Sequence, residues 1–166
     1  MTPISRIAAA LAAIALGLLA LTGCDPQRIS ELEEDVSTEA DVRDRFGVPE
    51  NVWQEPDGSH TLEYNRQPAG HQNYMITIGP NGKMTALRQV LAPHNFEKVQ
   101  PGMAQDQVRR MLGKPAKRTT YELKQETEWD WNWTDAPTRD MVFTVVFGPD
   151  GLVKRSGSTD KLPDGR

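Results

Sequence analysis

The chain has 166 residues, with 19 Lys and Arg against 23 Asp and Glu, and a formal net charge of −4. An acidic chain without a basic cluster binds nucleic acid or an anionic lipid surface poorly, so neither is an expected partner. The single cysteine, Cys24, excludes an intrachain disulfide even in an oxidising compartment.

The N-terminus has the parts of a secretory signal: a cation at Arg6, an apolar run from Ile7 to Leu21, and small residues after it. The run is too short for a comfortable transmembrane span. The stretch Leu21-Thr22-Gly23-Cys24 resembles the lipobox of bacterial lipoproteins, in which cleavage precedes a diacylglycerol-modified cysteine whose new amino terminus is acylated, commonly with palmitate. We therefore predict a cleaved signal peptide over residues 1–23 and lipid attachment at Cys24. The acyl chains would supply the membrane contact.

Cleavage leaves about 140 residues, the size of one ordinary domain or of two very small ones. We expect a lipidated tether at 24–29, two similar units at 30–93 and 94–158, and a flexible tail at 159–166.

An internal repeat supports the two units, because three sequence blocks recur in the same order. Residues 42–49 align with 108–115, residues 62–65 with 129–132, and residues 78–82 with 147–151, at separations of 66, 67 and 69 residues. The separation grows only across loops, as small insertions in a duplicated unit would produce.

Helix signals open each unit. A capping-box spacing at Ser30 predicts a first short helix. Thr38 is expected to cap a second helix, with Val42 and Phe46 on its apolar face and Gly47 at its end. In the second unit, Val108, Met111 and Leu112 form the corresponding apolar face and Gly113 ends the helix, but Ala104 stands at the cap and has no oxygen to accept a hydrogen bond.

Strand signals follow the helices. Apolar residues alternate with polar ones around Leu62 and Tyr64, and again around Trp129, Trp131 and Trp133. Two further alternating segments end in Gly-Pro-Asn-Gly and Gly-Pro-Asp-Gly, in which the final glycine accepts positive φ and a strand returns. The predicted fold is α+β, with two tandem units that each consist of two helices followed by a three-stranded antiparallel sheet.

The second unit carries a family resemblance. Pro101-Gly102-Met103, then Val108, then Leu112-Gly113-Lys114-Pro115 resembles the signature of the SmpA/OmlA family of outer-membrane lipoproteins, which includes BamE-like subunits of the β-barrel assembly machine. The first unit resembles a degenerate copy that lacks Pro-Gly-Met. The two-copy layout is also similar to the β-lactamase inhibitor protein. Both resemblances imply a binding protein without catalysis.

Asp25 bears on the choice of membrane. The family resemblance implies an outer-membrane lipoprotein facing the periplasm. In enteric bacteria, however, an Asp directly after the lipidated cysteine resembles the signal that retains lipoproteins in the inner membrane. We predict the outer membrane and keep the inner membrane as the alternative, with Asp25 as the sorting residue.

No catalytic or metal site is expected. His60, His71 and His94 have no second ligand at metal-binding spacing and are read as surface histidines. Ser156 and Ser158 belong to no nucleophile elbow. We therefore predict no enzyme activity, no cofactor and no small-molecule substrate.

Trp133 is the one residue that could exceed a structural role. By register, Trp129 and Trp131 replace Leu62 and Tyr64 in the core, whereas Trp133 replaces Arg66. All three indoles could be core aromatics, or Trp133 could mark a protein-binding surface, because aromatic residues are enriched at binding hot spots. A partner strand could also add to a free sheet edge.

The sequence thus predicts a non-enzymatic envelope lipoprotein that assists outer-membrane protein assembly or envelope integrity by binding a protein, and the β-barrel assembly machine is the expected partner. One alternative is an inhibitor-like regulatory module that binds a soluble periplasmic enzyme. Another is a purely structural envelope lipoprotein.

Overall fold

The computed structural model describes residues 29–162 of the chain. Residues 29–32 belong to an N-terminal unit, and the residues from Glu33 onward form a second compact unit. In the first of these, Leu32 N–H donates to Ile29 O over 3.1 Å, and Ser30 and Glu31 lie in a turn. The helix predicted to begin at Ser30 is therefore wrong.

Contacts made by the residues after this turn show why a helix does not continue there. Asp35 has a φ of 64°, in the left-handed region that interrupts an α-helix. Its N–H donates to Met84 O over 2.7 Å, and Met84 N–H donates to Ser37 O over 2.8 Å. Tertiary hydrogen bonds thus outweigh the local helix signal.

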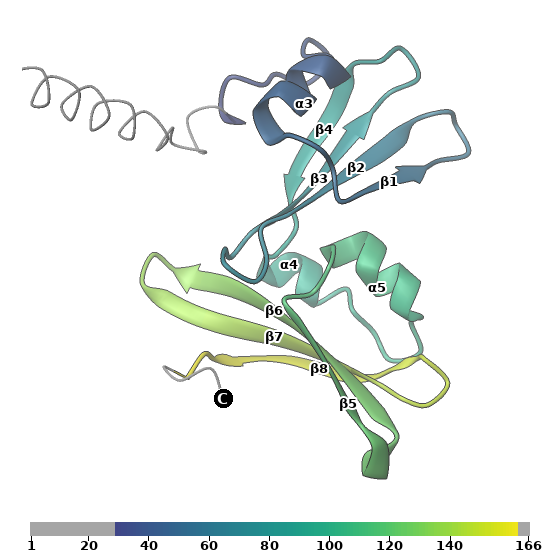
Figure 1. The fold of residues 1–166 in the computed structure, drawn as a ribbon, viewed down its shortest axis with the longest axis vertical. Coiled ribbons are helices and arrows are strands. Elements are labelled where there is room, and N and C mark those ends of the chain that lie inside the picture. The colour runs from purple at the N-terminus through teal and green to yellow at the C-terminus, as the bar shows by residue number, and fades with distance from the viewer. Residues whose placement is uncertain (1–28, 163–166) are drawn as a thin grey trace, which may run out of the picture. The chain divides into compact units, whose positions relative to one another are not determined.

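The first lobe consists of α3 (Glu39–Phe46) and the strands β1 (Asn51–Gln54), β2 (His60–Asn65), β3 (Asn73–Ile78) and β4 (Met84–Gln89). The four strands form one antiparallel sheet in the order β1-β2-β3-β4 (Figure 1).

The second lobe consists of α4 (Pro93–Phe96), α5 (Gln105–Leu112), β5 (Lys117–Tyr121), the 3₁₀ turn η2 (Glu122–Lys124), β6 (Glu126–Ala136), β7 (Arg139–Phe147) and β8 (Val153–Asp160). Its strands form a second antiparallel sheet in the order β5-β6-β7-β8. β8 includes Thr159 and Asp160, which were expected in the tail.

The α+β class is therefore confirmed, but the three-stranded sheets and the uniform pair of helices are wrong. Each sheet has a fourth strand, β1 or β5, that precedes the predicted ones. β1 has only four residues, and β5 reads Lys-Arg-Thr-Thr-Tyr. Both are edge strands, and neither shows the apolar alternation on which strand prediction depends.

The helix caps follow the prediction. Thr38 Oγ1 accepts from Asp41 N–H, and Asp41 Oδ2 accepts from Thr38 N–H over 2.8 Å, which completes a capping box. At Ala104 only half of this arrangement exists: Gln107 Oε1 accepts from Ala104 N–H over 2.8 Å, and the methyl group accepts nothing.

Equivalent hydrogen bonds recur in the two lobes. Val42 N–H donates to Thr38 O and Val108 N–H to Ala104 O, both over 3.1 Å. Each Gly-Pro-Asx-Gly turn ends in a glycine with positive φ, 76° at Gly82 and 74° at Gly151, as predicted.

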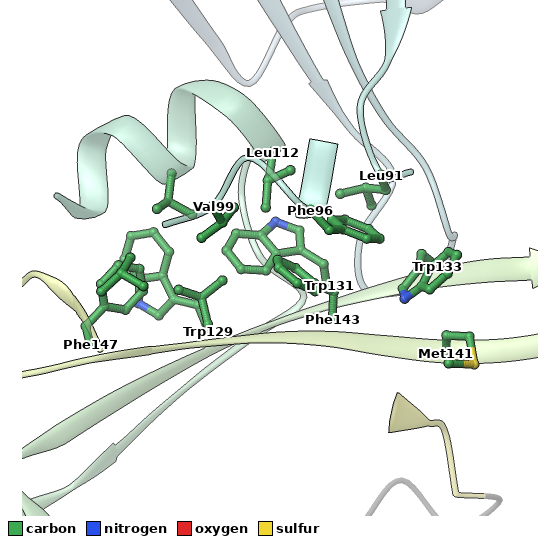
Figure 2. Close-up of a cluster of buried hydrophobic side chains, with 13 residues drawn as sticks. Leu91, Phe96, Val99, Leu112, Trp129, Trp131, Trp133, Met141, Phe143 and Phe147 are labelled. Carbon is green, nitrogen blue, oxygen red and sulfur yellow. The ribbon is translucent and has the colours of Figure 1, made fainter. Parts of the chain in front are cut away.

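The second lobe buries an aromatic core between its sheet and its helices (Figure 2). Phe96 stacks on Phe143 with ring centroids 4.1 Å apart, and Trp129 meets Phe147 at 4.9 Å. Trp131 is fully buried. Val108 and Leu112 of α5 complete the cluster, as their predicted apolar face requires.

Candidate functional site

The predicted lipid-attachment residue Cys24 and the predicted sorting residue Asp25 lie outside the described residues. None of the helices within residues 29–162 is long and apolar enough to span a membrane.

Trp133 lies in the core of the second lobe and not at its surface. Its side chain is 4% exposed and meets the ring of Phe96 edge to face, with centroids 5.1 Å apart (Figure 2). The structure thus agrees with the alternative in which all three indoles are core aromatics. The indole Nε1–H of Trp133 has no acceptor in the described part of the chain, so the residue retains one unsatisfied polar atom.

An apolar groove runs beside Trp133, between α4 and β8. Its floor and walls are Pro93, Phe96, Val99, Trp133, Met141 and Phe143. We call it the α4–β8 groove. On the β8 side only Ser156, Gly157 and Ser158 line it. Glu97 and Asp135 are its charged residues, and no Lys, Arg or His lines it.

The opposite face of the same sheet is polar. Glu128 and Asp130 of β6 and Thr144 of β7 line a shallow hollow there, together with Tyr121. Asp130 Oδ1 accepts from Thr144 Oγ1–H over 2.6 Å. This face therefore offers charge and hydrogen-bonding groups, whereas the α4–β8 groove offers apolar surface.

Glu126, on the same polar face, is held by two cations. Arg155 Nη2 lies 2.8 Å and Lys154 Nζ 2.9 Å from its carboxylate oxygens. The hydrogen bonds from Arg155 and then Lys154 lower the pKa of the Glu126 carboxyl from 4.5 to about 2. Glu126 thus ties β6 to β8 by charge-assisted contacts.

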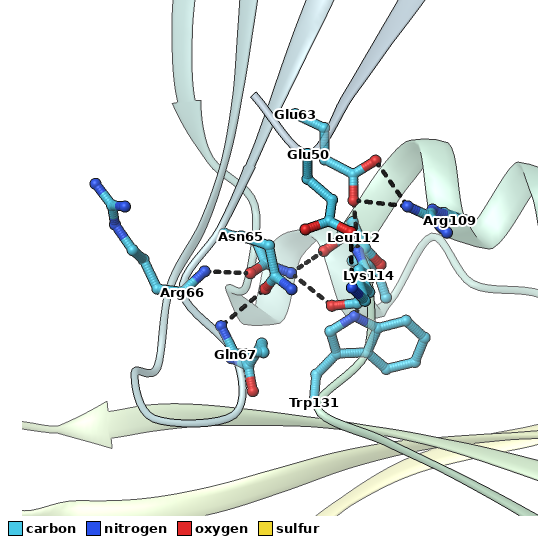
Figure 3. A network of polar contacts seen from close by, with 11 residues as sticks. Glu50, Glu63, Asn65, Arg66, Gln67, Arg109, Leu112, Lys114 and Trp131 are labelled. Carbon is cyan, nitrogen blue, oxygen red and sulfur yellow. Dashed lines mark hydrogen bonds and ion pairs between the residues drawn. The ribbon is translucent and has the colours of Figure 1, made fainter. Parts of the chain in front are cut away.

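A polar network joins β2 and β3 to the end of α5 (Figure 3). Glu63 is fully buried, and its carboxylate accepts from Lys114 N–H over 2.8 Å and faces Arg109 Nη2 at 3.4 Å. Asn73 Nδ2 donates to Leu112 O over 2.8 Å and to Lys114 O over 3.2 Å. These bonds satisfy carbonyl groups that the end of a helix leaves unpaired.

A second polar contact links the loop after β2 to β6. Gln67 Nε2 donates to Asn132 O over 2.8 Å, and Asn132 N–H donates to Gln67 Oε1 over 3.0 Å. Asn132 Nδ2 also donates to Pro68 O over 3.0 Å. The side-chain amide of Gln67 thus exchanges two hydrogen bonds with the backbone of Asn132, as the backbone of a neighbouring strand would.

Two of the three histidines contact a carboxylate. His60 Nε2 lies 3.0 Å from Glu39 Oε2, and His71 Nε2 lies 3.4 Å from Asp140 Oδ1. His94 lies in α4. Within residues 29–162, no three His, Cys, Asp or Glu side chains are grouped to hold a metal ion.

Sequence reasoning missed both Glu63 and the α4–β8 groove. Nothing in the local pattern marks Glu63, because its partners lie 46 and 51 residues away. The groove had one readable signal, the small residues Ser156, Gly157 and Ser158 in a strand that pairs with apolar β7.

Residues 89–157 match the family described as the outer membrane protein assembly factor BamE domain. The second lobe is therefore similar to the BamE domain. The match covers α4, α5 and β5–β7 and ends within β8, so all residues that line the α4–β8 groove except Ser158 lie within the matched range. This family match confirms the resemblance predicted from the Pro-Gly-Met and Leu-Gly-Lys-Pro motifs. No curated protein sequence matches the chain.

Three solved structures are similar to this chain. One is the osmotically inducible lipoprotein OsmE, at 22% identity over 43% of this chain and 75% of that one, with a TM-score of 0.37. Another is the DUF4309 family protein YjgB from Bacillus subtilis, at 18% identity, with coverage of 78% and 82% and a TM-score of 0.30. The third is described as a β-lactamase inhibitor protein from Streptococcus mutans, at 12% identity, with coverage of 74% and 82% and a TM-score of 0.32. At these scores, none carries an argument about function.

Proposed function

We propose that this protein is a lipid-anchored, periplasm-facing accessory in outer-membrane protein assembly or envelope integrity, and that it acts by binding protein rather than by catalysis. The match of residues 89–157 to the BamE assembly-factor domain is the observation that carries the proposal. The lipobox at residues 21–24 supports it, since an assembly factor of this type works beside a membrane.

The two lobes are proposed to be tandem copies of one unit, the first of them degenerate. Their sheets share one strand order, and each has a register shift at the corresponding place, Thr77/Ile78 and Val146/Phe147. Isolated bridges Thr38–Lys83 and Ala104–Leu152 also correspond.

The anchor is tested by metabolic labelling with a radioactive or clickable fatty acid. The native protein is expected to take up the label, and Cys24→Ser is expected to lose it. Label that persists in the variant would contradict the lipobox.

The sorting role of Asp25 is tested by density-gradient fractionation of membranes. If Asp25 acts as a retention signal, Asp25→Ser should move the protein from the inner-membrane fraction toward the outer-membrane fraction. If the native protein and the variant distribute in the same way, Asp25 has no role in sorting.

The partner class is tested by purifying the tagged protein from detergent-solubilised membranes and identifying what accompanies it. Subunits of the β-barrel assembly machine would support the proposal. A single soluble periplasmic enzyme would instead indicate the inhibitor-like alternative.

A further inference from the structure

The free edge of β8 adjoins the α4–β8 groove. Lys161 N–H donates to Asp140 O over 2.9 Å, so the backbone groups of Lys161 face β7. Because neighbouring residues of a strand turn their backbone groups to opposite sides, those of Ser156, Ser158 and Asp160 face away from β7. Among residues 29–162, no strand pairs with that side of β8, because β8 is the last strand of the sheet.

The first lobe shows how the corresponding edge is covered there. Leu87 pairs with Ile76 in the first sheet, and Ser156 pairs with Val145 in the second. Each residue of the second pair lies 69 positions after its counterpart in the first, so Ser156 corresponds to Leu87. Leu87 N–H, on the open side of β4, donates to Glu34 Oε1 over 3.2 Å. A segment of the chain therefore lies against the edge of β4.

In the described part of the chain, no segment covers the edge of β8 in this way beyond its first residue. Gly102 and Met103 exchange hydrogen bonds with Val153 over 2.8 Å, and this pairing ends there. Ser156–Asp160 are exposed throughout. Edge strands usually carry a proline, a bulge or charges that prevent pairing. Within Ser156–Asp160 the one such feature is Asp160, and its carboxylate is paired with Arg139 at 2.8 Å.

Small side chains on β8 open the groove. Leu87 and Gln89 of the first lobe correspond to Ser156 and Ser158, whose short side chains leave Phe96 and Phe143 lining a hollow. Trp133, which also lines the hollow, carries the buried Nε1–H that lacks an acceptor. An acceptor oxygen supplied by a partner in the groove would satisfy this donor.

We propose that the α4–β8 groove binds an extended segment of a partner polypeptide, which adds to β8 as a fifth strand along Ser156–Asp160. Side chains alternate along such a strand, so every second residue of the partner is apolar and enters the groove. Asp135 is already paired with Arg139 at 3.2 Å, so the carboxylate of Glu97, with no cation lining the groove, selects a basic residue beside it. This binding mode rests on the proposed function and specifies its partner.

The test uses the full-length protein in detergent and a fluorescent peptide that alternates valine or phenylalanine with threonine and ends in lysine. Binding is measured by fluorescence anisotropy and by hydrogen exchange. We expect saturable binding and slowed exchange of the amides of Ser156, Ser158 and Asp160. A peptide of the same composition without the alternation should bind at least about tenfold more weakly.

Two variants locate the contact. Ser158→Pro removes an N–H that faces away from β7 and so spares the sheet, and it is expected to weaken the peptide at least about tenfold, whereas Ser158→Ala is expected to bind as the native protein does. Glu97→Lys is expected to weaken binding by repulsion, and Glu122→Lys, the same charge change on the distant η2 turn, is expected to leave it unchanged.

Native affinity in both Ser158→Pro and Glu97→Lys would overturn the proposal, as would equal binding of both peptides. Protection of the Ser156 and Ser158 amides that rises with protein concentration, without peptide, would assign the edge to a second copy of this chain. If the peptide fails while assembly subunits still co-purify, this binding mode fails and the proposed function stands. If the peptide binds but those subunits do not co-purify, the binding mode stands and the proposed function fails.

Discussion

Tyr64 and Trp131 make the same contact in the two lobes, each donating a hydrogen bond to the glycine carbonyl that follows a helix. Tyr64 Oη–H donates to Gly47 O over 3.1 Å, and Trp131 Nε1–H donates to Gly113 O over 3.0 Å. Helix ends leave carbonyl groups unpaired, and an aromatic side chain from the sheet satisfies one in each lobe. Different residue types thus fulfil one structural requirement.

Tyr64→Phe removes this bond at nearly constant volume and is expected to lower the free energy of unfolding by about 1 kcal/mol. Trp131→Phe also leaves a cavity, so its cost should reach about 2 to 4 kcal/mol. Urea denaturation of the chain from Asp25 onward measures both. Trp129→Phe is the control for volume, because Trp129 makes no bond to Gly113. Equal losses at Trp129 and Trp131 would mean that the indole bond contributes nothing.

Ala104→Thr is expected to stabilise the protein by about 1 kcal/mol, since its hydroxyl can accept from Gln107 N–H and complete the half-formed capping box. Thr38→Ala, which breaks the complete box of the first lobe, should destabilise by a similar amount. Both effects appear as shifts in the urea midpoint at constant slope. Two shifts of the same sign would contradict the correspondence of Thr38 with Ala104.

Glu126 makes stability depend on pH in the acid range. Its folded pKa is about 2 against an ordinary value of 4.5, so the folded state binds fewer protons than the unfolded state between these values. The contribution of Glu126 is therefore complete above pH 4.5 and is lost as the pH falls toward 2. Urea midpoints measured across this range should fall less steeply for Glu126→Gln than for the native protein. Glu122→Gln, which changes a carboxylate on the exposed η2 turn, should keep the native slope.

The elements that sequence predicted are those whose signals are local. Thr38, Gly47 and the Gly-Pro-Asx-Gly turns act through their own backbone, and they were placed correctly. Ser30 carried an equally good local signal, but the bonds from Asp35 N–H to Met84 O and from Met84 N–H to Ser37 O hold the following segment out of a helix. Local chemistry could not reveal that contact.

Edge and contact residues escaped prediction for a related reason. β5 lacks the alternation that marked β6 because four of its five side chains are exposed, on both faces of the sheet. The sequence left open whether Trp133 lies in the core or at a binding surface, because Arg66 occupies its place in the first lobe. In the structure, Phe96 of α4 covers it. The short helix α4, which has no counterpart in the described first lobe, thus buries a position that Arg66 occupies there.

Glu63→Ala is expected to be the most destabilising single change at the network of Figure 3, with a loss of about 3 to 5 kcal/mol. The carboxylate is fully buried, and its removal leaves Lys114 N–H without its acceptor and Arg109 without its partner. Glu63→Gln keeps an acceptor oxygen and should lose less. Glu50→Ala is the matched control: Glu50 pairs with the ammonium of the same Lys114 at 2.6 Å, but its side chain is 38% exposed, so the loss should stay below about 1 kcal/mol. Urea unfolding of the three variants ranks the losses. Equal effects of Glu63→Ala and Glu50→Ala would show that burial gives the Glu63 contact no greater weight than a surface ion pair.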